Sequence, residues 1–289
     1  MKFNDNQIST LIKYYREKLS NIYDINEVNA IIYIVFEDLL GLNKTDILKD
    51  PEHRINESDL IRINKAFKRI AVYEPVQYVL GKTYFCDLTF IVNNNVLIPR
   101  PETEELVRII INDHKDDLYP SDIIDIGTGS GCIAVSLKKY LSASKTTAID
   151  VSETALEIAK KNAEINNTEV EFICTDILNN PKNNKLETFD VIVSNPPYVL
   201  QSEKLLMNKN VTDFEPSLAL YVSDENPLIY YKAIIEFSTL HLKKGGNIYL
   251  EINENKSEEI KIMLLNSGYK DIKILKDIHD KNRFISAKK

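Results

Sequence analysis

Asn195, Pro196, Pro197 and Tyr198 are the residues of this sequence whose types and order are best suited to chemistry. The two prolines fix the backbone and lack N–H groups, so the side-chain oxygen of Asn195 and nearby carbonyls remain as acceptors. Two acceptors that grip both N–H bonds of a planar amide or amino group can turn its weakly nucleophilic nitrogen toward an electrophile. Tyr198 can stack on the same planar group. The segment predicts a site that activates a planar nitrogen, with Asn195, Pro196 and Tyr198 as catalytic residues and all four residues holding the substrate.

A glycine-rich turn runs from Asp125 to Gly131, after a buried apolar run and before a predicted helix. Glycine permits a tight turn and lets the backbone approach a ligand closely. Gly127, Gly129 and Gly131 have the spacing G-x-G-x-G, which differs from the G-x-G-x-x-G of dinucleotide sites, and no lysine follows as in a phosphate-binding loop. By itself the turn leaves two interpretations open, a nucleotide-type ligand site and a loop that is merely tight.

Two further acids follow the next two predicted strands. Asp150 can accept hydrogen bonds from both hydroxyls of a ribose, and Asp176 can accept one from an adenine amino group while Ile177 covers the ring. Together with the glycine turn, they suit an adenosine that carries no pyrophosphate. This combination favours S-adenosylmethionine over NAD as the cofactor. Acids that merely end strands would explain any one of these positions but hardly all of them in register.

These residues need a scaffold, and strands that alternate with helices from about residue 105 onward supply it. The predicted strands span 123–126, 146–150, 170–173, 189–193, 247–252, 271–276 and 283–287. Repeated βα units imply a mostly parallel sheet with helices on both faces. The last two strands are too close in sequence for a crossover helix, so they should be antiparallel. Asn195 follows the fourth strand, where such a sheet binds ligands, and this position argues against a turn that simply ends a strand.

The first 104 residues differ from the rest of the chain. Apolar residues at helical spacing predict a small helical bundle over residues 1–74, which includes a helix that begins at Asp24 and stops near Gly41. We interpret this bundle as a packing or partner-docking module. Short β-rich runs at 76–80, 88–92 and 96–98 then predict a hairpin linker. The predicted domains are therefore a helical domain at 1–74, a β-hairpin linker at 75–104 and a catalytic domain at 105–289.

Composition sets limits on the class of protein. The 289 residues suffice for one large and one small domain, and the net charge of -7 is spread along the chain, which argues against a large nucleic-acid footprint. No apolar run is long enough for a membrane span and the N-terminus lacks the pattern of a signal peptide, so a cytoplasmic protein with no membrane partner is expected. Cys86, Cys132 and Cys174 have no ligand spacing; we expect buried free thiols and no metal site.

The chain resembles the HemK/PrmC family of peptide chain release factor N5-glutamine methyltransferases over essentially its whole length. Asn-Pro-Pro-Tyr after a fourth strand is shared by adenine, cytosine and glutamine methyltransferases, and other segments narrow the choice. The resemblance is carried by Glu74–Gly81, Phe85, Phe90, Val96–Glu104, the Gly127–Gly131 turn, Phe214-Glu215-Pro216 with Ala219-Leu220, Leu250-Glu251-Ile252 and Lys276-Asp277. The stretch Ile98-Pro99-Arg100-Pro101-Glu102-Thr103-Glu104 is highly specific.

The resemblance implies a fold, an activity and a partner. The fold is a Rossmann-like class I S-adenosylmethionine methyltransferase domain, an α/β fold with a mostly parallel seven-stranded sheet and an antiparallel last hairpin, preceded by a small helical bundle. The activity is methylation of the glutamine in the Gly-Gly-Gln motif of release factors, with the helical domain docking on the release factor and residues 99–104 helping to close the site. The implied cofactor contacts are Gly127, Thr128, Gly129, Ser130, Gly131, Asp150, Asp176, Ile177 and Asn195.

Three alternatives remain at this point. A glutamine methyltransferase for a ribosomal protein would use the same site and differ in its N-terminal domain. A DNA or RNA amino-methyltransferase would need a basic face or a recognition domain, and neither is visible in the sequence. A catalytically silent scaffold that only binds the cofactor is disfavoured by the intact Asn195 and by the acids Asp150 and Asp176.

Overall fold

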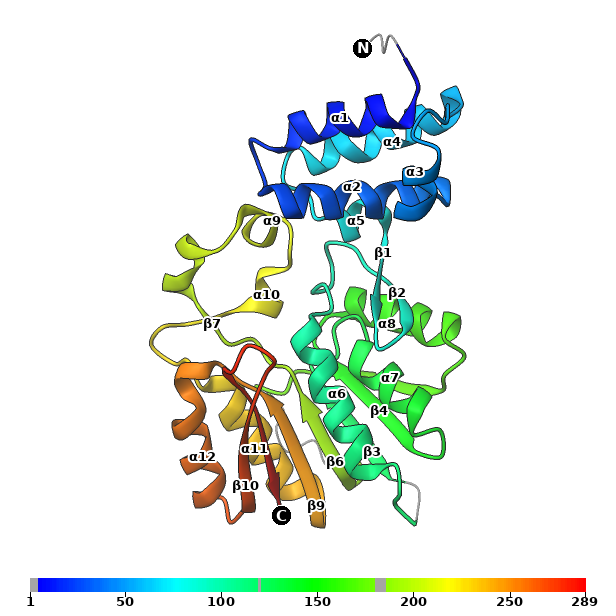
Figure 1. Ribbon diagram of the computed structural model, residues 1–289. Helices are drawn as coiled ribbons and strands as arrows, with labels where there is room; N and C mark the ends of the chain where they lie inside the picture. The colour runs from blue at the N-terminus through cyan, green and yellow to red at the C-terminus, as the bar shows by residue number, and fades with distance from the viewer. Residues whose placement is uncertain (1–4, 119–120, 180–185) are drawn as a thin grey trace. The chain divides into compact units, whose positions relative to one another are not determined.

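The computed structural model describes residues 5–118, 121–179 and 186–289. By packing, the chain divides into a smaller unit, Met1–Gly81 with Asn208–Phe214, and a larger unit, Lys82–Met207 with Glu215–Lys289. The smaller unit is helical and the larger one is an α/β unit built around a sheet (Figure 1). Among the described residues, no helix combines the length and the apolar composition required to cross a membrane.

The smaller unit has one apolar cluster, which is formed by its helices before Gly81. Its helices are α1 (Ile8–Leu19), α2 (Ile25–Leu40), α3 (Lys44–Lys49), α4 (Glu57–Ile70), α5 (Val76–Leu80) and α9 (Lys209–Thr212). Asp24 caps α2 by accepting from two backbone N–H groups, and Gly41 ends this helix in the left-handed conformation, as the sequence predicts. The rings of Tyr15 and Phe67 stack with their centroids 3.8 Å apart. The helical character predicted for this part of the chain is confirmed.

The larger unit holds a seven-stranded sheet in the order β10-β11-β9-β6-β3-β4-β5. Its strands are β3 (Asp122–Ile126), β4 (Lys145–Asp150), β5 (Val170–Cys174), β6 (Phe189–Ser194), β9 (Leu242–Glu251), β10 (Lys270–Lys276) and β11 (Asn282–Lys288). The strands β3, β4, β5, β6 and β9 pair in parallel, whereas β11 is antiparallel to both of its neighbours. The predicted sheet and its antiparallel closing hairpin are therefore confirmed.

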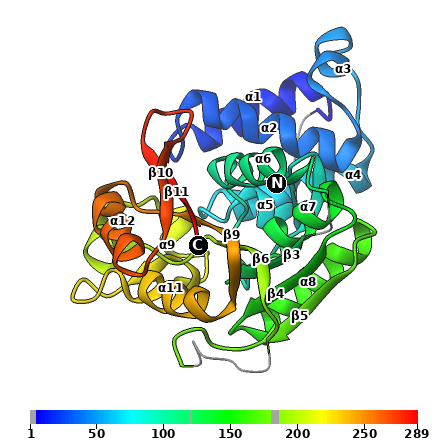
Figure 2. The same cartoon turned by 90° about the horizontal axis from the view of Figure 1, so that it is seen from below.

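Helices cover both faces of this sheet (Figure 2). They are α6 (Pro101–His114), α7 (Cys132–Tyr140) and α8 (Glu153–Ile165) on one side, and α11 (Ile229–His241) and α12 (Ser257–Asn266) on the other. Consecutive strand residues point to opposite faces, so Ile123 packs with α6 and α7 while Ile124 packs with α11. Because both faces are buried, consecutive strand residues can both be apolar, as in Ile123-Ile124 of β3 and Val191–Val193 of β6.

The remaining elements of the larger unit are short. They are β1 (Lys82–Phe85), β2 (Leu88–Ile91), β7 (Val199–Leu200), the 3-10 helix η1 (Gln201–Leu206), α10 (Ser217–Leu220), β8 (Tyr221–Val222) and the 3-10 helix η2 (Glu254–Lys256). Strands β1 and β2 form an antiparallel hairpin, and its buried rings Phe85 and Phe90 belong to the apolar cluster that α6 and α7 share. The hairpin thus packs as part of the larger unit.

The structure corrects several local expectations. Val76–Leu80 is the helix α5 and not a strand, because Pro75 precedes it at the N-cap and Gly81 ends it with a φ of +75°. A short apolar run cannot by its pattern alone distinguish a helix from a strand. Residues 96–98 form no strand either, since the amide of Ile98 donates to the side chain of Glu215. Cys174 is exposed at the end of β5, whereas the other two cysteines are buried as expected.

Gly131 allows α7 to start close to α8. Its φ is +80°, and a Cβ atom there would lie 3.0 Å from the Cβ atom of Ala159. We expect Gly131→Ala to lower the free energy of unfolding by about 1–2 kcal/mol from the left-handed backbone and by roughly a further 1–3 kcal/mol from overpacking. Urea unfolding of the full chain followed by circular dichroism would measure this loss.

Gly268→Ala is the matched control. Gly268 has a φ of +85° but open space around its missing side chain, so only the backbone contribution of about 1–2 kcal/mol should remain. Equal losses in the two variants would contradict a tight contact between α7 and α8.

Candidate active site

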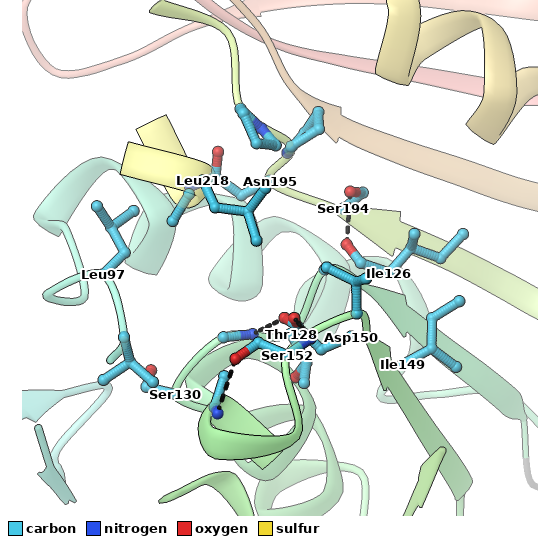
Figure 3. A pocket seen from close by; sticks show the side chains of 18 of the residues that line it. Leu97, Ile126, Thr128, Ser130, Ile149, Asp150, Ser152, Ser194, Asn195 and Leu218 are labelled. Atoms are coloured by element: carbon cyan, nitrogen blue, oxygen red, sulfur yellow. Dashed lines mark hydrogen bonds between the residues drawn. The ribbon is translucent and has the colours of Figure 1, made fainter. Parts of the chain in front are cut away.

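A cavity of about 290 Å³ lies at the carboxyl ends of the parallel strands in the larger unit. This edge of a doubly wound sheet is where ligands usually bind. The cavity walls come from the turn after β3, the ends of β4 and β5, the segment after β6, the chain between β2 and α6, and α10 and α11. Figure 3 shows Asn195 and Leu218 on one side of the cavity and Thr128, Asp150 and Ser152 on another.

Most of the residues predicted from the sequence meet in this one cavity. Those that line it are Gly127, Thr128, Gly129, Ser130, Asp150, Asp176, Ile177, Asn195, Pro196 and Pro197. Gly131 and Tyr198 are not part of its wall. Gly131 instead contacts Ala159, and the hydroxyl of Tyr198 donates to Glu251 at 3.0 Å. Whether these residues bind a cofactor or a substrate stays a prediction.

Backbone conformation and backbone hydrogen bonds determine the shape of the glycine turn. Gly127 and Gly129 have φ values of +73° and +55°, which side chains rarely permit. The amides of Gly127 and Thr128 both donate to the carbonyl of Ile149 on β4, at 2.9 and 3.0 Å. These bonds fix the turn at the sheet edge and leave the far side of the loop facing the cavity.

The buried carboxyl group of Asp125 supports the glycine turn from the side that faces away from the cavity. Thr128 Oγ1 donates to Asp125 Oδ2 at 2.6 Å, and Asp125 has no exposed surface. Burial raises the pKa of Asp125 to about 7 despite the Thr128 hydrogen bond, which lowers it. The Asp125 side chain therefore anchors Thr128 and does not line the cavity.

Asp150 and Asp176 present carboxylates at the ends of β4 and β5. The two oxygens of Asp150 accept from the amides of Gly129 and Ser152, at 2.8 and 2.9 Å, while burial raises its pKa. Asp176 Oδ1 accepts from the amide of Leu178 at 2.8 Å. Each carboxylate is thus held by local backbone and lies in the cavity wall, where its remaining lone pairs can accept hydrogen bonds from a ligand.

The segment after β6 is tied to β3 and α6. Ser194 Oγ donates to the carbonyl of Ile126 at 2.6 Å, and Asn195 Nδ2 donates to Thr103 Oγ1 at 3.1 Å. Pro196 and Pro197 follow in the wall of the cavity. Asn195 therefore reaches the cavity from a segment held by polar contacts to two neighbouring elements.

Glu251, at the end of β9, is a functional candidate to which the sequence assigned no role. Only 1% of its surface is exposed, and it accepts from Thr103 Oγ1 at 2.7 Å and from Tyr198 Oη at 3.0 Å. Burial raises the pKa of Glu251 to about 7 and also raises the pKa of Tyr198 above its ordinary value. The only sequence signal for Glu251 was its place in a family motif, because its partners lie far away along the chain.

A third buried acid, Glu215, holds the rim of the cavity. Glu215 accepts from Arg100 Nη2 at 2.6 Å and from the amide of Ile98 at 3.1 Å. Its side chain is 1% exposed, against 32% for Arg100. Residues 96–100 and 216–219, which both contribute to the cavity wall, are thereby joined at this point.

The arrangement can hold an adenosine-like ligand beside a group with N–H donors. Acid side chains and a glycine turn lie at the ends of β3, β4 and β5, apolar side chains such as Ile177 and Ile133 contribute to the same wall, and the oxygen-rich Asn195 segment follows β6. Among the residues with described positions, no group of three or more His, Cys, Asp or Glu side chains could hold a metal ion.

Family models match both parts of the chain. Residues 10–81 match the model described as "PrmC N-terminal domain", and residues 105–213 match "Methyltransferase small domain". The chain is 41% identical over 283 residues to "Release factor glutamine methyltransferase" of Flavobacterium psychrophilum, which covers 96% of this chain and 99% of that protein. It is 39% identical over 280 residues to the protein of the same name from Bacteroides thetaiotaomicron, with 97% and 99% covered.

Solved structures share the fold. A methyltransferase from Pyrococcus furiosus superposes with a TM-score of 0.50 at 22% identity, and covers 81% of this chain and 98% of that one. The T. thermophilus 16S rRNA N2 G1207 methyltransferase, solved with AdoMet and guanosine, gives a TM-score of 0.51 at 15% identity, with 72% and 55% covered. At these identities the likeness concerns the fold alone.

We expect Glu215→Ala to loosen the rim segment that contains Ile98. The amide of Ile98 would lose a charged acceptor worth about 1.5–3 kcal/mol, so its hydrogen exchange should accelerate by roughly ten- to a hundredfold. Hydrogen exchange with mass spectrometry on the full chain would measure this. Glu215→Gln, which keeps an oxygen acceptor, should show a smaller effect, and unchanged exchange in both variants would contradict the proposed anchor.

Proposed function

The chain belongs to the family of release factor glutamine methyltransferases, and from this premise we propose that it methylates a peptide chain release factor. The methyl group passes from S-adenosylmethionine to the side-chain amide nitrogen, N5, of the glutamine in the Gly-Gly-Gln motif. The observation that carries the proposal is the meeting of Asn195, Pro196 and Pro197 with Asp150 and Asp176 in one cavity. The identity of 41% and 39% to the Flavobacterium and Bacteroides proteins, over nearly the whole length of the chain, supports the choice of substrate.

S-adenosylmethionine, when bound, supplies the electrophilic methyl group. The residues present suit this cofactor, since Asp150 can accept from the ribose hydroxyls and Asp176 from the adenine amino group while Ile177 covers the ring. The glycine turn at Gly127 and Gly129 leaves room for the remainder of the molecule close to the backbone. Thr128, Ser130 and Asn195 in the cavity wall complete the cofactor site that we propose, together with Gly131, which is not part of that wall.

Asn195 and Pro196 hold the substrate nitrogen. The side-chain oxygen of Asn195 and the carbonyl of Pro196 can each accept a hydrogen bond from one of the two N–H groups of the glutamine amide. This grip orients the nitrogen lone pair toward the methyl group and opposes its delocalisation, so positioning and electrostatics lower the barrier. Pro197 restricts the backbone of the segment. The sequence predicts that the Tyr198 ring stacks on the amide, but Tyr198 is not part of the cavity wall and its hydroxyl donates to Glu251.

The other parts of the chain are assigned by the same proposal. Residues 1–74 dock on the release factor, and residues 75–104 link the domains, with residues 99–104 helping to close the site. Residues 105–289 carry out the transfer. The enzyme then acts in the cytoplasm, with a protein and not a nucleic acid as its substrate. A ribosomal protein as the substrate, or an amino group of a nucleic acid, are the alternatives that an experiment must separate.

Purified protein with S-adenosylmethionine should add one methyl group to the Gly-Gly-Gln glutamine of a release factor. Mass spectrometry of the peptide that contains this motif would detect the product and its position. Parallel reactions with ribosomal proteins and with DNA serve as controls. An unmodified release factor beside a methylated ribosomal protein or DNA would contradict the proposal.

Replacement of Asn195 by alanine should abolish transfer, whereas cofactor affinity should fall much less. Loss of one contact that is made in the transition state costs about 3 kcal/mol, or roughly a 10²- to 10³-fold fall in kcat. Single-turnover methylation and calorimetric titration of S-adenosylmethionine would separate the two effects. Asn112→Ala, an exposed position of α6 outside the cavity wall, is the control, and near-wild-type kcat in Asn195→Ala would rule out the mechanism.

A further inference from the structure

We propose that Thr103 and Glu251 are positioning residues that determine which end of the Asn195 amide faces the cavity. The inference rests on the proposed function, because it concerns the atom that would accept the N–H of the substrate. A side-chain amide has an oxygen that only accepts and a nitrogen that only donates. Rotation of Asn195 by half a turn would therefore replace the acceptor that the glutamine amide needs with a donor that repels it.

Two hydrogen bonds connect Asn195 through Thr103 to Glu251, and we call this chain of donors and acceptors the relay. Asn195 Nδ2 lies 3.1 Å from Thr103 Oγ1, which in turn lies 2.7 Å from Glu251 Oε2. Thr103 and Glu251 are only 2% and 1% exposed, so bulk water does not compete for these bonds. The hydroxyl of Thr103 has one proton, and a carboxylate can only accept it.

The direction of the hydrogen bond from Thr103 to Glu251 fixes the direction of the bond between Asn195 and Thr103. Since Thr103 gives its proton to the Glu251 carboxylate, its oxygen is left as an acceptor toward Asn195. Only the NH₂ end of the Asn195 amide can donate to that oxygen, so the amide oxygen turns away from Thr103. The cavity wall contains Asn195, and its oxygen is then the atom available to a substrate N–H.

A protonated Glu251 would reverse the relay. A carboxylic acid can donate to Thr103, whose own proton is then available to the oxygen of Asn195. The amide would turn over and present its NH₂ group to the substrate, which has no acceptor on its own amide nitrogen. The charge on Glu251 thus selects between an orientation of Asn195 that holds the glutamine and one that does not.

The surroundings of Glu251 make this charge sensitive to pH. Burial is the main cause that raises its pKa to about 7, and the acid Glu102 on α6 adds to the rise, whereas Arg283 on β11 opposes it. Tyr198, after β6, donates to the second carboxylate oxygen of Glu251, and Tyr231 on α11 donates to the backbone carbonyl of Glu251 at 3.2 Å.

We expect kcat of the wild type to fall as the pH drops through about 7, because Glu251 takes up a proton.

Thr103→Val tests the relay directly. Valine keeps the shape of threonine and removes the hydroxyl, so the NH₂ group of Asn195 loses its acceptor and kcat should fall by roughly ten- to a hundredfold. The dissociation constant of S-adenosylmethionine should change little, and Thr103→Ser should recover most of the lost kcat. Methylation of the full-length release factor as a function of pH, with calorimetric titration of the cofactor, gives both readouts.

Glu251→Gln provides a second route to the same test. The amide introduced by this substitution carries no charge, and its NH₂ group can donate to Thr103, so kcat should fall and its decline below pH of about 7 should disappear. Tyr231→Phe is the matched control, because it removes a buried hydrogen bond to the backbone of Glu251 and leaves the carboxylate contacts in place. It should lower the thermal midpoint while the pH profile of kcat stays that of the wild type.

The outcomes separate this inference from the proposed function. A wild-type protein that does not methylate the release factor would overturn both. An active wild type with unchanged kcat in Thr103→Val, or with the acid-side decline retained in Glu251→Gln, would overturn the relay alone. An equal fall of kcat in Tyr231→Phe would also overturn the relay, because loss of packing would then explain the effect.

Discussion

Parallel pairing between β3 and its two neighbours is the constraint on which the rest of the active site depends. Ile126 lies opposite Ile149 on β4 and opposite Ser194 on β6, so the three strands end at one level. The glycine turn, Asp150 and Asn195 each lie at one of these ends. Two further bonds hold the edge together, from Gly127 to Ile149 and from Ser194 to Ile126. If the pairing register of one strand shifted by one residue, its side chains would point to the opposite faces of the sheet, and the acids would no longer lie beside the Asn195 segment.

The site also depends on carboxyl groups that are buried for a structural purpose. Asp125, Glu215 and Glu251 are almost fully removed from solvent, and each accepts hydrogen bonds from hydroxyl, backbone or guanidinium donors. A buried carboxylate without such partners would be costly, so each acid specifies the geometry of the groups around it. Asp125 supports the glycine turn, Glu215 joins two parts of the rim, and Glu251 ties α6 to the segment after β6. These three acids fix the positions of the side chains that face the cavity.

Some of the local expectations failed where pattern was ambiguous. Val76–Leu80 is apolar and β-rich, yet Pro75 and Gly81 at its two ends favour one turn of helix. Residues 96–98 have the composition of a strand but pair with no described strand, because the carboxylate of Glu215 takes the Ile98 amide. The parallel and antiparallel parts of the seven-stranded sheet, in contrast, followed from repeated βα units and short connections, which restrict the topology strongly.

The sequence by itself determined the sheet, the helical N-terminal part and the cavity residues at the strand ends, because these features depend on local periodicity and on the order of strands and turns. Asp150, Asp176 and Asn195 were recognisable for that reason. Only the tertiary structure decided that Tyr198 points to Glu251, that Gly131 packs on Ala159, and that Asn195 donates to Thr103. Those contacts join residues distant along the chain, and their partners depend on how α6 and β9 pack around the end of β6, which no local pattern encodes.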